Sequence, residues 1–338
     1  MASDYDGGSR TENSFRRRVS RLRRHRYFGL LDVLPSAFWL VVFFLIPLGV
    51  MFYYSFGQRG AFGEVLVGVR YLGLQQYAQF FVSEGATLPE ALWYSLAWIL
   101  EAVLPGDTQF AATDPTPYVQ LTIRSIWLGL VATVVSFLMG YPVAYYLARS
   151  APAEYRTLLI ALVVLPYWAS YLVRVYAIRL LLAKNGVVPS LLGALPFVSE
   201  PPSLLFTSFS VQFGLVYIWL PFMILPIYAS IEDIDWSLHE AAMDLGADRL
   251  DAFRKVTLPL SMPGVVAGSI LVFIPSVGAY VIPELLGSPN TATIGEFIAA
   301  QFGAAGNWPL GAAGAFVLTG IMLVAIRAYQ RYGGGEFL

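Results

Sequence analysis

Residues that could carry out covalent or metal chemistry are scarce in this chain of 338 residues, which has no cysteine and only two histidines, His25 and His239. Disulfides, thiolate catalysis and cysteine-ligated metals are therefore impossible. The two histidines lie in separate polar segments, so they do not predict a metal site, and we assign His239, beside Glu240, to a solvated helix surface. No cofactor is expected, and no nucleophile and base can be paired into an intramembrane enzyme.

This polypeptide is not expected to hydrolyse nucleotide by itself, because neither of its lysines lies in a phosphate-binding loop. Only Lys184 and Lys255 are present, and neither follows the Gly-x-x-x-x-Gly frame that places a lysine on nucleotide phosphates. Any energy source must therefore sit on another chain, and the protein is not expected to be an enzyme.

The polar stretch 232–261 predicts a short docking helix. Four apolar residues there share the i, i+3, i+4, i+7 spacing of one helix face: Leu238, Ala241, Ala242 and Leu245. Since two of the four are alanines, a partner could approach the helix backbone closely. The alternative is a solvated helix that folds back on its own chain.

Local signals shape this stretch into a compact knob of two helices. Ser237 and Glu240 have the Ser-x-x-Glu spacing of a capping box, and Gly246 supplies the positive φ that ends the first helix. Asp248 can cap a second short helix, and Pro259 then closes the segment and starts the return to the next apolar span.

The composition places the knob in a membrane protein. With 57% hydrophobic and 13% charged residues and a mean hydropathy of +0.63, the chain lies outside the range of soluble proteins. A spanning helix needs about 20 mainly apolar residues. Six stretches qualify, so we expect an all-α integral membrane protein with six transmembrane helices, at residues 34–56, 121–148, 157–182, 207–231, 262–286 and 308–328.

Basic residues predict the orientation. The arginine-rich segment before the first span should be cytoplasmic, and six spans then place the 232–261 stretch and the C-terminal tail on the same side. This segment could instead be a nucleic-acid arm or a targeting peptide, but the span after it is too long for a signal peptide. We therefore interpret this segment as a topology signal that also contacts anionic lipid, and we expect no nucleic-acid partner. The protein is expected to be a multi-pass protein of the cell membrane with both termini in the cytoplasm. The arginines are Arg10, Arg16, Arg17, Arg18, Arg21, Arg23, Arg24 and Arg26.

The knob also carries a family resemblance. Glu240-Ala241-Ala242, Gly246 and the ending Val256-Thr257-Leu258-Pro259 resemble the EAA loop of binding-protein-dependent ABC importer permeases, although Val256 stands where the family usually has isoleucine. In that family the loop forms coupling helices that fit a cleft on a cytoplasmic ATPase subunit. The coupling positions carried over to this chain are Glu240, Ala241, Ala242, Leu245, Gly246, Leu258 and Pro259.

The resemblance implies a type I ABC importer permease fold whose spans form half of a translocation pathway. The implied partners are cytoplasmic ABC ATPase subunits, a second permease subunit, an extracytoplasmic solute-binding protein and membrane lipid. We then expect a cytoplasmic tail over 1–30, partly disordered, a first transmembrane helix over 31–56, an extracytoplasmic loop over 57–120, a five-helix permease core over 121–330 and a cytoplasmic tail over 331–338.

Further stretches between residues 120 and 325 resemble the spermidine/putrescine permeases, which implies putrescine or spermidine as cargo. Two features depart from that pattern: Gly278-Ala279-Tyr280 lacks the glutamate that often precedes the Val-Ile-Pro-Glu run, and the 57–120 loop is longer than expected. The stretches are Gly140-Tyr141-Pro142-Val143-Ala144-Tyr145, Leu165-Pro166-Tyr167-Trp168, Leu172-Val173-Arg174-Val175-Tyr176, Val281-Ile282-Pro283-Glu284-Leu285-Leu286-Gly287 and Asn307-Trp308-Pro309.

A pathway for a polycation would need aromatic faces and carboxylates. Alternatively, the aromatic residues could form a belt at the membrane interface. The charges of Arg174 and Arg179 argue mildly against a pathway for cations, unless these side chains snorkel outward or pair with a carboxylate such as Glu284 or Glu101. The candidate pathway residues are Tyr167, Trp168, Tyr171, Arg174, Tyr176, Tyr280 and Glu284.

Two other interpretations stay open. The chain could be an ABC permease for another small solute, or a self-contained ion-coupled secondary transporter, which would need ionisable residues at mid-span or discontinuous helices. Small residues of the last span, from Gly306 to Ala315, permit close packing either against a second permease subunit or within this chain.

Overall fold

The computed structural model describes residues 34–61, 63–68, 70–82, 89–90, 93, 116–195 and 202–333, with the backbone alone over 328–333. The predicted tail 1–30, much of the predicted loop 57–120, Glu101 and residues 334–338 lie outside this part of the chain. The described residues are mostly helical, and their one sheet is the antiparallel pair β1 (Gln58–Arg59) and β2 (Val65–Leu66).

Six of the described helices are long and apolar enough to cross a membrane, which confirms the predicted number of spans. The chain is therefore an all-α, multi-pass membrane protein. The six helices are Leu34–Tyr54, Pro117–Ser150, Tyr171–Gly193, Ser208–Glu232, Arg249–Val277 and Trp308–Arg327.

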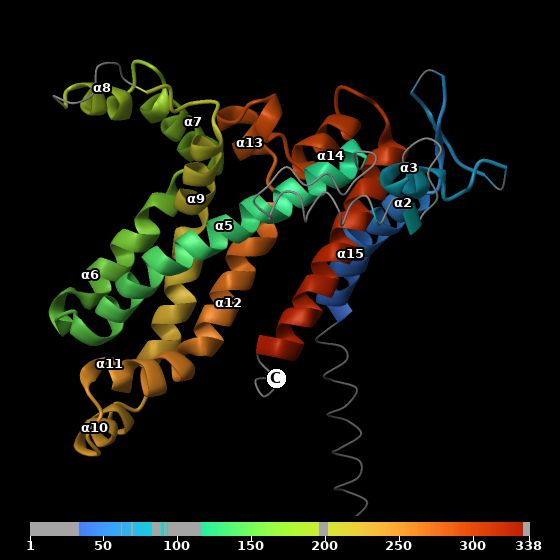
Figure 1. Ribbon diagram of the computed structural model, residues 1–338. Coiled ribbons are helices and arrows are strands. Elements are labelled where there is room, and N and C mark those ends of the chain that lie inside the picture. The colour runs from blue at the N-terminus through green and yellow to red at the C-terminus, as the bar shows by residue number, and fades with distance from the viewer. Residues whose placement is uncertain are drawn as a thin grey trace, which may run out of the picture.

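Figure 1 shows how the helical elements are arranged, with α10 at one end of the bundle and α8, α13 and α14 at the other. We call these the α10 end and the α13 end. In chain order the elements, with π and 3-10 turns labelled η, are η1 (Val41–Leu45), α2 (Ile46–Tyr54), α3 (Gln75–Phe81), α5 (Pro117–Tyr145), η2 (Tyr146–Ser150), α6 (Ala153–Val164), η3 (Leu165–Trp168), α7 (Tyr171–Leu182), α8 (Val187–Gly193), α9 (Ser208–Glu232), α10 (Ser237–Asp244), α11 (Arg249–Ala252), η4 (Phe253–Thr257), α12 (Leu258–Val277), α13 (Val281–Leu286), η5 (Pro289–Thr291), α14 (Ile294–Phe302) and α15 (Trp308–Gly333).

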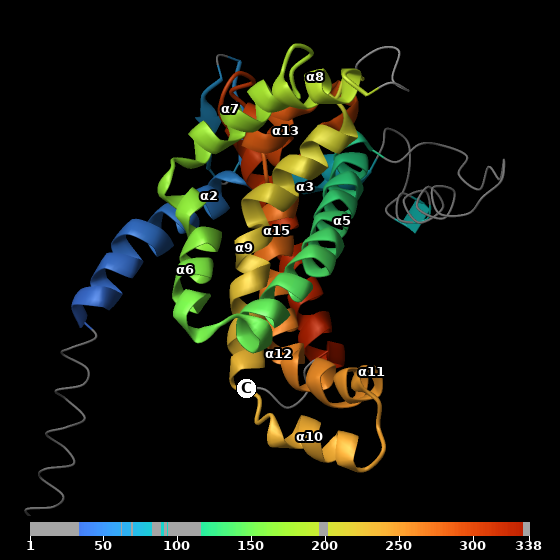
Figure 2. The same ribbon diagram turned by 90° about the vertical axis from the view of Figure 1, so that its left-hand side faces the viewer.

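Helices α5, α9 and α12 form the packed centre of the bundle (Figures 1 and 2). Gly264 and Gly268 lie one turn apart on α12 and both face α9. A Cβ on Gly264 would overlap the carbonyl oxygen of Pro226, and one on Gly268 would lie 2.9 Å from the sulfur of Met223. Small residues at this i, i+4 spacing let two membrane helices approach backbone to backbone.

Two hydrophobic clusters fill the space around these helices. One lies toward the α13 end and joins α5, α7, α9 and α13 through buried residues that include Leu128, Val175, Leu215 and Ile282. The other joins α5, η2, α9 and α12 toward the α10 end and takes in the base of the knob through Trp236 and Phe253. Most of the buried side chains are aliphatic, so close packing rather than polar pairing holds the bundle together.

The third span differs from its prediction. We expected one helix over 157–182, but α6 ends at Val164, the 3-10 turn η3 follows, and α7 starts at Tyr171. Pro166 lies in η3 and lacks a backbone N–H, and Ala169 is extended, so the helical ladder stops there. Figure 2 shows α6 and α7 as the two limbs of a bent arm beside α9.

The fifth span also differs, at both ends. It was expected over 262–286, but the helix is unbroken from Arg249 to Val277 and α13 is a separate short helix. Pro259 lies in the first turn of α12, inside this unbroken helix, and not at the start of a new one. It follows the π turn η4, where the regular i to i−4 hydrogen bonds are already interrupted, so its missing N–H breaks no regular ladder.

The first and last spans lie beside each other at the edge of the bundle (Figure 1), where the rings of Phe52 and Phe316 pack edge to face at 5.1 Å. Among the described residues 34–54 none is buried. Two small residues of the last span pack within this chain, since Gly311 lies against Phe302 of α14 and Gly314 against Ile298, whereas nothing lies within 4 Å of the position a Cβ on Gly306 would take.

Candidate functional site

Helix α10 presents the predicted apolar stripe to the exterior of the chain. Leu238 is 50% exposed and Leu245 is 90% exposed, while Ala241 is exposed and Ala242 is half-buried. A leucine that leaves nine-tenths of its surface uncovered at the tip of a knob suits contact with another protein. The described part of the chain does not fold back to cover this stripe, which disfavours the alternative of a helix folded on its own chain.

The start of α10 is fixed differently from the prediction. Ser237 is the first residue of the helix rather than its cap, so the Ser237 and Glu240 capping box is wrong. The carboxylate of Asp235 instead accepts a hydrogen bond from the Ser237 N–H at 3.0 Å, and hydrogen bonding from Ser237 lowers the pKa of Asp235. An ionised carboxylate at a helix N-terminus also complements the helix dipole.

The end of α10 is as predicted. Gly246 has φ +94°, in the left-handed region that favours glycine, and the Ala247 N–H donates back to the Ala242 carbonyl at 3.0 Å. Asp248 then caps the next helix, because its carboxylate accepts from the Asp251 N–H at 2.7 Å. The knob is therefore built from two capped helices around one sharp glycine turn.

His239 is not the solvated residue that we predicted. It is half-buried, and its Nδ1 lies 3.2 Å from the hydroxyl oxygen of Thr257, with which it shares a hydrogen bond. His239 is not one of the coupling positions carried over from the family. Of those positions, Glu240 is exposed on α10, and Leu258 and Pro259 lie in the first turn of α12.

A second group of predicted residues gathers where α7, η3 and α9 meet. The Arg174 guanidinium stacks on the Tyr167 ring at 4.1 Å, and that ring packs edge to face on Phe222. The Nε and Nη1 atoms of Arg174 are buried and have no hydrogen-bond partner within the described chain. Arg179 likewise lies over a ring, that of Phe206 at 5.7 Å. Of the two alternatives for these arginines, snorkelling or pairing with a carboxylate such as Glu284 or Glu101, a pair with Glu284 is not seen in the described chain, where both guanidinium groups lie over ring faces, and Glu101 lies outside the described residues.

The remaining predicted pathway residues do not form one cluster. Trp168 is 87% exposed and Tyr176 is also exposed, as belt residues would be. Tyr171 lies near Tyr280, which is exposed at the start of α13. Glu284, one turn after Tyr280, is exposed and lies outside the membrane spans.

Glu296 is a further candidate residue, which was not predicted from the sequence. It lies in the first turn of α14, close enough to Glu284 for the two carboxylates to repel each other. Burial raises the pKa of Glu296 and the charge of Glu284 raises it further, while a hydrogen bond from the helix start opposes them. With Tyr280, these residues make an anionic, aromatic patch at the α13 end.

An aromatic stripe along α9 was also missed. Phe209, Phe213 and Tyr217 are exposed and spaced four residues apart, and successive ring centroids lie 6.1 and 6.5 Å apart. Tyr217 lies near Tyr167, so the stripe runs toward the Arg174 site. The i, i+4 spacing was visible in the sequence, but only the fold shows that this face of α9 is uncovered by the described residues.

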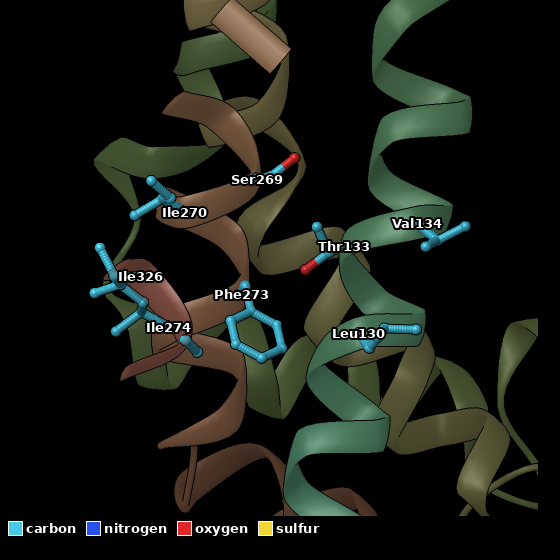
Figure 3. Close-up of a pocket in the computed structure, with 9 residues that line it drawn as sticks. Leu130, Thr133, Val134, Ser269, Ile270, Phe273, Ile274 and Ile326 are labelled. Atoms are coloured by element: carbon cyan, nitrogen blue, oxygen red, sulfur yellow. The ribbon is translucent and has the colours of Figure 1, made fainter. Parts of the chain in front are cut away.

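The cavity in Figure 3 does not suit a charged ligand. Its volume is about 310 Å³, and α5, α12 and α15 line it with nine residues, none of them charged, including Leu130, Ile270 and Phe273. Among the described residues, no three His, Cys, Asp or Glu side chains are grouped to hold a metal ion.

The family profile, together with six membrane-spanning helices, defines a class: the membrane permeases of ABC importers. The chain belongs to the family described as "Binding-protein-dependent transport system inner membrane component", whose sequence profile matches residues 159–332. It is 40% identical over 214 residues to the spermidine/putrescine transport system permease protein PotB of Haemophilus influenzae, covering 63% of this chain and 74% of that protein.

Two further relatives are of similar closeness. The chain is 37% identical over 235 residues to PotB of Escherichia coli K12, covering 70% of this chain and 85% of that protein. It is 38% identical over 227 residues to the inner membrane ABC transporter permease protein YdcU of the same organism, covering 64% of this chain and 71% of that protein.

A solved structure confirms the fold. A chain of a bacterial ABC transporter involved in the import of the acidic polysaccharide alginate superposes with a TM-score of 0.65 at 17% identity, over 93% of this chain and 99% of that one. This likeness confirms the predicted fold class, and the family profile and the sequence relatives confirm the assignment to the ABC importer permeases.

Proposed function

We propose that this chain is one of two permease subunits of an ATP-driven importer of putrescine or spermidine. In this proposal it forms half of the translocation pathway and receives the force of ATP hydrolysis through α10. The observation that best supports a polyamine as the cargo is the 37% identity to a spermidine/putrescine permease over 85% of that protein's length.

The exposed stripe of α10 supports the docking of a cytoplasmic ATPase subunit. Small side chains at Ala241 and Ala242 allow close approach, and Leu245 at the tip supplies an uncovered apolar anchor. The chain has no phosphate-binding lysine motif of its own, so hydrolysis must come from that partner.

Charge supports a cytoplasmic α10 end. Arg149, Arg156, Arg249, Arg254 and Lys255 lie on the elements of this end. In a six-span topology the arginine-rich N-terminal segment and the C-terminal tail would join them, so that 15 of the chain's 21 Lys and Arg lie on one side, as the positive-inside rule requires of a cytoplasmic face. The α13 end would then face outward, where a solute-binding protein delivers cargo, and both termini would be cytoplasmic.

The patch of Tyr280, Glu284 and Glu296 supports entry of a polycation at the α13 end. An exposed ring and an exposed carboxylate one helical turn apart can bind one ammonium group by a cation–π contact and an ion pair. Arg174 and Arg179 already lie over ring faces of their own. We therefore place the first cation contact at the patch rather than at Tyr167.

Replacing residues of this patch should weaken cargo uptake without uncoupling it. Tyr280→Leu is expected to raise the KM for putrescine about 2-fold to 30-fold, since a cation–π contact is worth roughly 0.5 to 2 kcal/mol, and Glu284→Gln, which removes the ion pair, is expected to raise it as well. Tyr280→Phe keeps the ring face and serves as the matched control. Initial uptake rates in proteoliposomes measure the effect, and an unchanged KM in both variants would remove the patch from the pathway.

The proposed function is tested by reconstitution with the accompanying ATPase, second permease and binding protein. Uptake of radiolabelled putrescine is expected to need all of these chains and ATP. Binding of putrescine or spermidine to the isolated binding protein tests the cargo separately, because a binding protein that takes neither would remove the polyamine assignment and leave the importer standing.

One structural feature also occurs in ion-coupled secondary transporters: the breaks between α6 and α7 and between α12 and α13. Such transporters place ionisable side chains at these breaks near mid-membrane, whereas the middle stretches of the described spans carry no Asp or Glu, and Lys184 of the third span lies in the turn between α7 and α8 at the α13 end. Putrescine uptake by this chain alone, driven by an ion gradient without ATP, would favour that function instead.

A further inference from the structure

Helix α10 is tied to the membrane helices by the residues around its first turn. Trp236 directly precedes the helix and His239 lies on it, and their rings meet edge to face at 5.7 Å. The opposite end of α10 carries Leu245, which is 90% exposed. Figure 2 shows α10 lying across the end of the bundle, below α11 and α12. The helix is therefore held near one end and uncovered at the other.

One tie runs to α12. His239 Nδ1 shares a 3.2 Å hydrogen bond with the Thr257 hydroxyl, which is fully buried. Thr257 is the last residue of the π turn η4, directly before α12, and the helix continues without a break to Val277. A displacement of His239 therefore acts within a membrane-spanning helix and not on a loop.

The other tie runs to α5. The Arg149 guanidinium of η2 lies 4.5 Å above the Trp236 ring, and Tyr145 packs edge to face on the same ring at 6.4 Å. Tyr145 also packs on Phe253 of η4 at 5.7 Å. Trp236 thus joins the start of α10 to the end of α5, beside the tie made by His239.

The two ties differ in how firmly they fix the direction in which α10 can move. Ring packing is apolar and tolerates sliding, whereas a hydrogen bond is directional and weakens steeply when its angle changes. Between Trp236 and His239, only His239 therefore fixes the direction in which α10 can move relative to α12.

We propose that His239 is a positioning residue that, through its hydrogen bond to Thr257, makes α10 and α12 move as one body when the ATPase displaces α10. The inference rests on the proposed docking of the ATPase to α10 and adds the residue pair that transmits the motion. It requires no contact between His239 and cargo, nucleotide or ATPase.

The cysteine-free sequence permits a direct test by paired spin labels in the reconstituted complex. Asp244→Cys on α10 and Leu271→Cys on α12 both place the label at an exposed site, away from the apolar stripe. In the otherwise unchanged chain, the distance between the labels is expected to stay narrow and constant with and without a non-hydrolysable ATP analogue. In His239→Leu and Thr257→Val the distribution should broaden and shift on adding the analogue.

Transport provides the second readout. His239→Leu and Thr257→Val are each expected to lower putrescine uptake per ATP hydrolysed about fivefold, as loss of one hydrogen bond predicts, and the double variant should be no worse than either. His239→Asn and Thr257→Ser keep a hydrogen-bonding group and should retain coupling. Distances that stay narrow in both single variants, or losses that multiply in the double variant, would overturn the inference.

Failure of this inference can be told apart from failure of the proposed function. If Glu240→Lys abolishes uptake while His239→Leu leaves both readouts unchanged, α10 docks the ATPase but His239 does not transmit the motion. If Glu240→Lys itself leaves ATP-driven uptake intact, the docking proposal fails and this inference fails with it. The label distances do not depend on cargo, so they stand even if the binding protein takes no polyamine.

Discussion

Gly246→Asp is expected to abolish ATP-driven uptake while the chain still inserts and folds. Gly246 has φ +94°, which a side chain with a Cβ adopts only at a cost of about 1 to 2 kcal/mol, and nothing lies within 4 Å of where that Cβ would stand. The substitution therefore meets no internal clash. It distorts the turn at the tip of the knob and adds a charge beside Leu245, where the proposed ATPase contact is made.

Matched substitutions separate backbone strain from charge. Gly246→Asn is uncharged and tolerates positive φ, so it should keep part of the uptake, whereas Gly246→Asp should keep almost none. Purification of the complex through a tagged ATPase subunit, together with uptake in proteoliposomes, measures docking and transport on one sample.

Glu240→Lys should have the same outcome as Gly246→Asp through charge reversal alone, because Glu240 is exposed and its replacement alters no buried contact. Glu154→Lys is its control, since it makes the same change at an exposed site of the α10 end outside the knob. Uptake that survives both Gly246→Asp and Glu240→Lys would show that α10 does not couple ATP hydrolysis to transport.

The parts of this site that the sequence predicts are the local ones. Asp248 and Gly246 act within one turn of their own helices, and the apolar stripe of α10 is a periodicity within eight residues, so both could be read without a fold. The hydrogen bond of His239 could not, because Thr257 lies eighteen residues away across a glycine turn and a π turn. Its geometry depends on how the knob folds back on α12.

The prolines of the spans also show that sequence alone does not predict where a helix bends. Pro142, Pro221 and Pro226 lie inside unbroken helices, whereas Pro166 lies where the third span breaks. Each removes one N–H, and whether the helix continues depends on neighbouring helices that satisfy the freed carbonyls. Hydropathy therefore gives the number of spans, and tertiary packing decides where they bend.

Arginine pairing depends on such a bend. We expected Arg174 to snorkel or to meet a carboxylate, and it stacks on Tyr167, seven residues earlier. Along one straight helix those two residues would lie two turns apart. The break at η3 folds the chain so that the guanidinium reaches the ring face, and no carboxylate is needed.

Gly264→Ala is expected to destabilise the bundle more than any other single methyl addition that we propose. The added Cβ would overlap the backbone carbonyl oxygen of Pro226 in α9, and a backbone atom in the packed centre cannot move aside as a flexible side-chain end can. Overpacking of this kind costs about 1 to 3 kcal/mol. Gly264→Leu should prevent α9 and α12 from packing and remove the folded protein from the membrane fraction.

The matched controls are Gly49→Ala in the first span and Gly320→Ala in the last, where nothing lies within 4 Å of the position a Cβ would take. All three variants remove one glycine from a membrane helix, so any gain in helix propensity is shared and cancels in the comparison. Melting temperatures in detergent, followed by size-exclusion chromatography, should fall for Gly264→Ala alone. Equal melting temperatures for the three would mean that α12 can withdraw from α9 without loss.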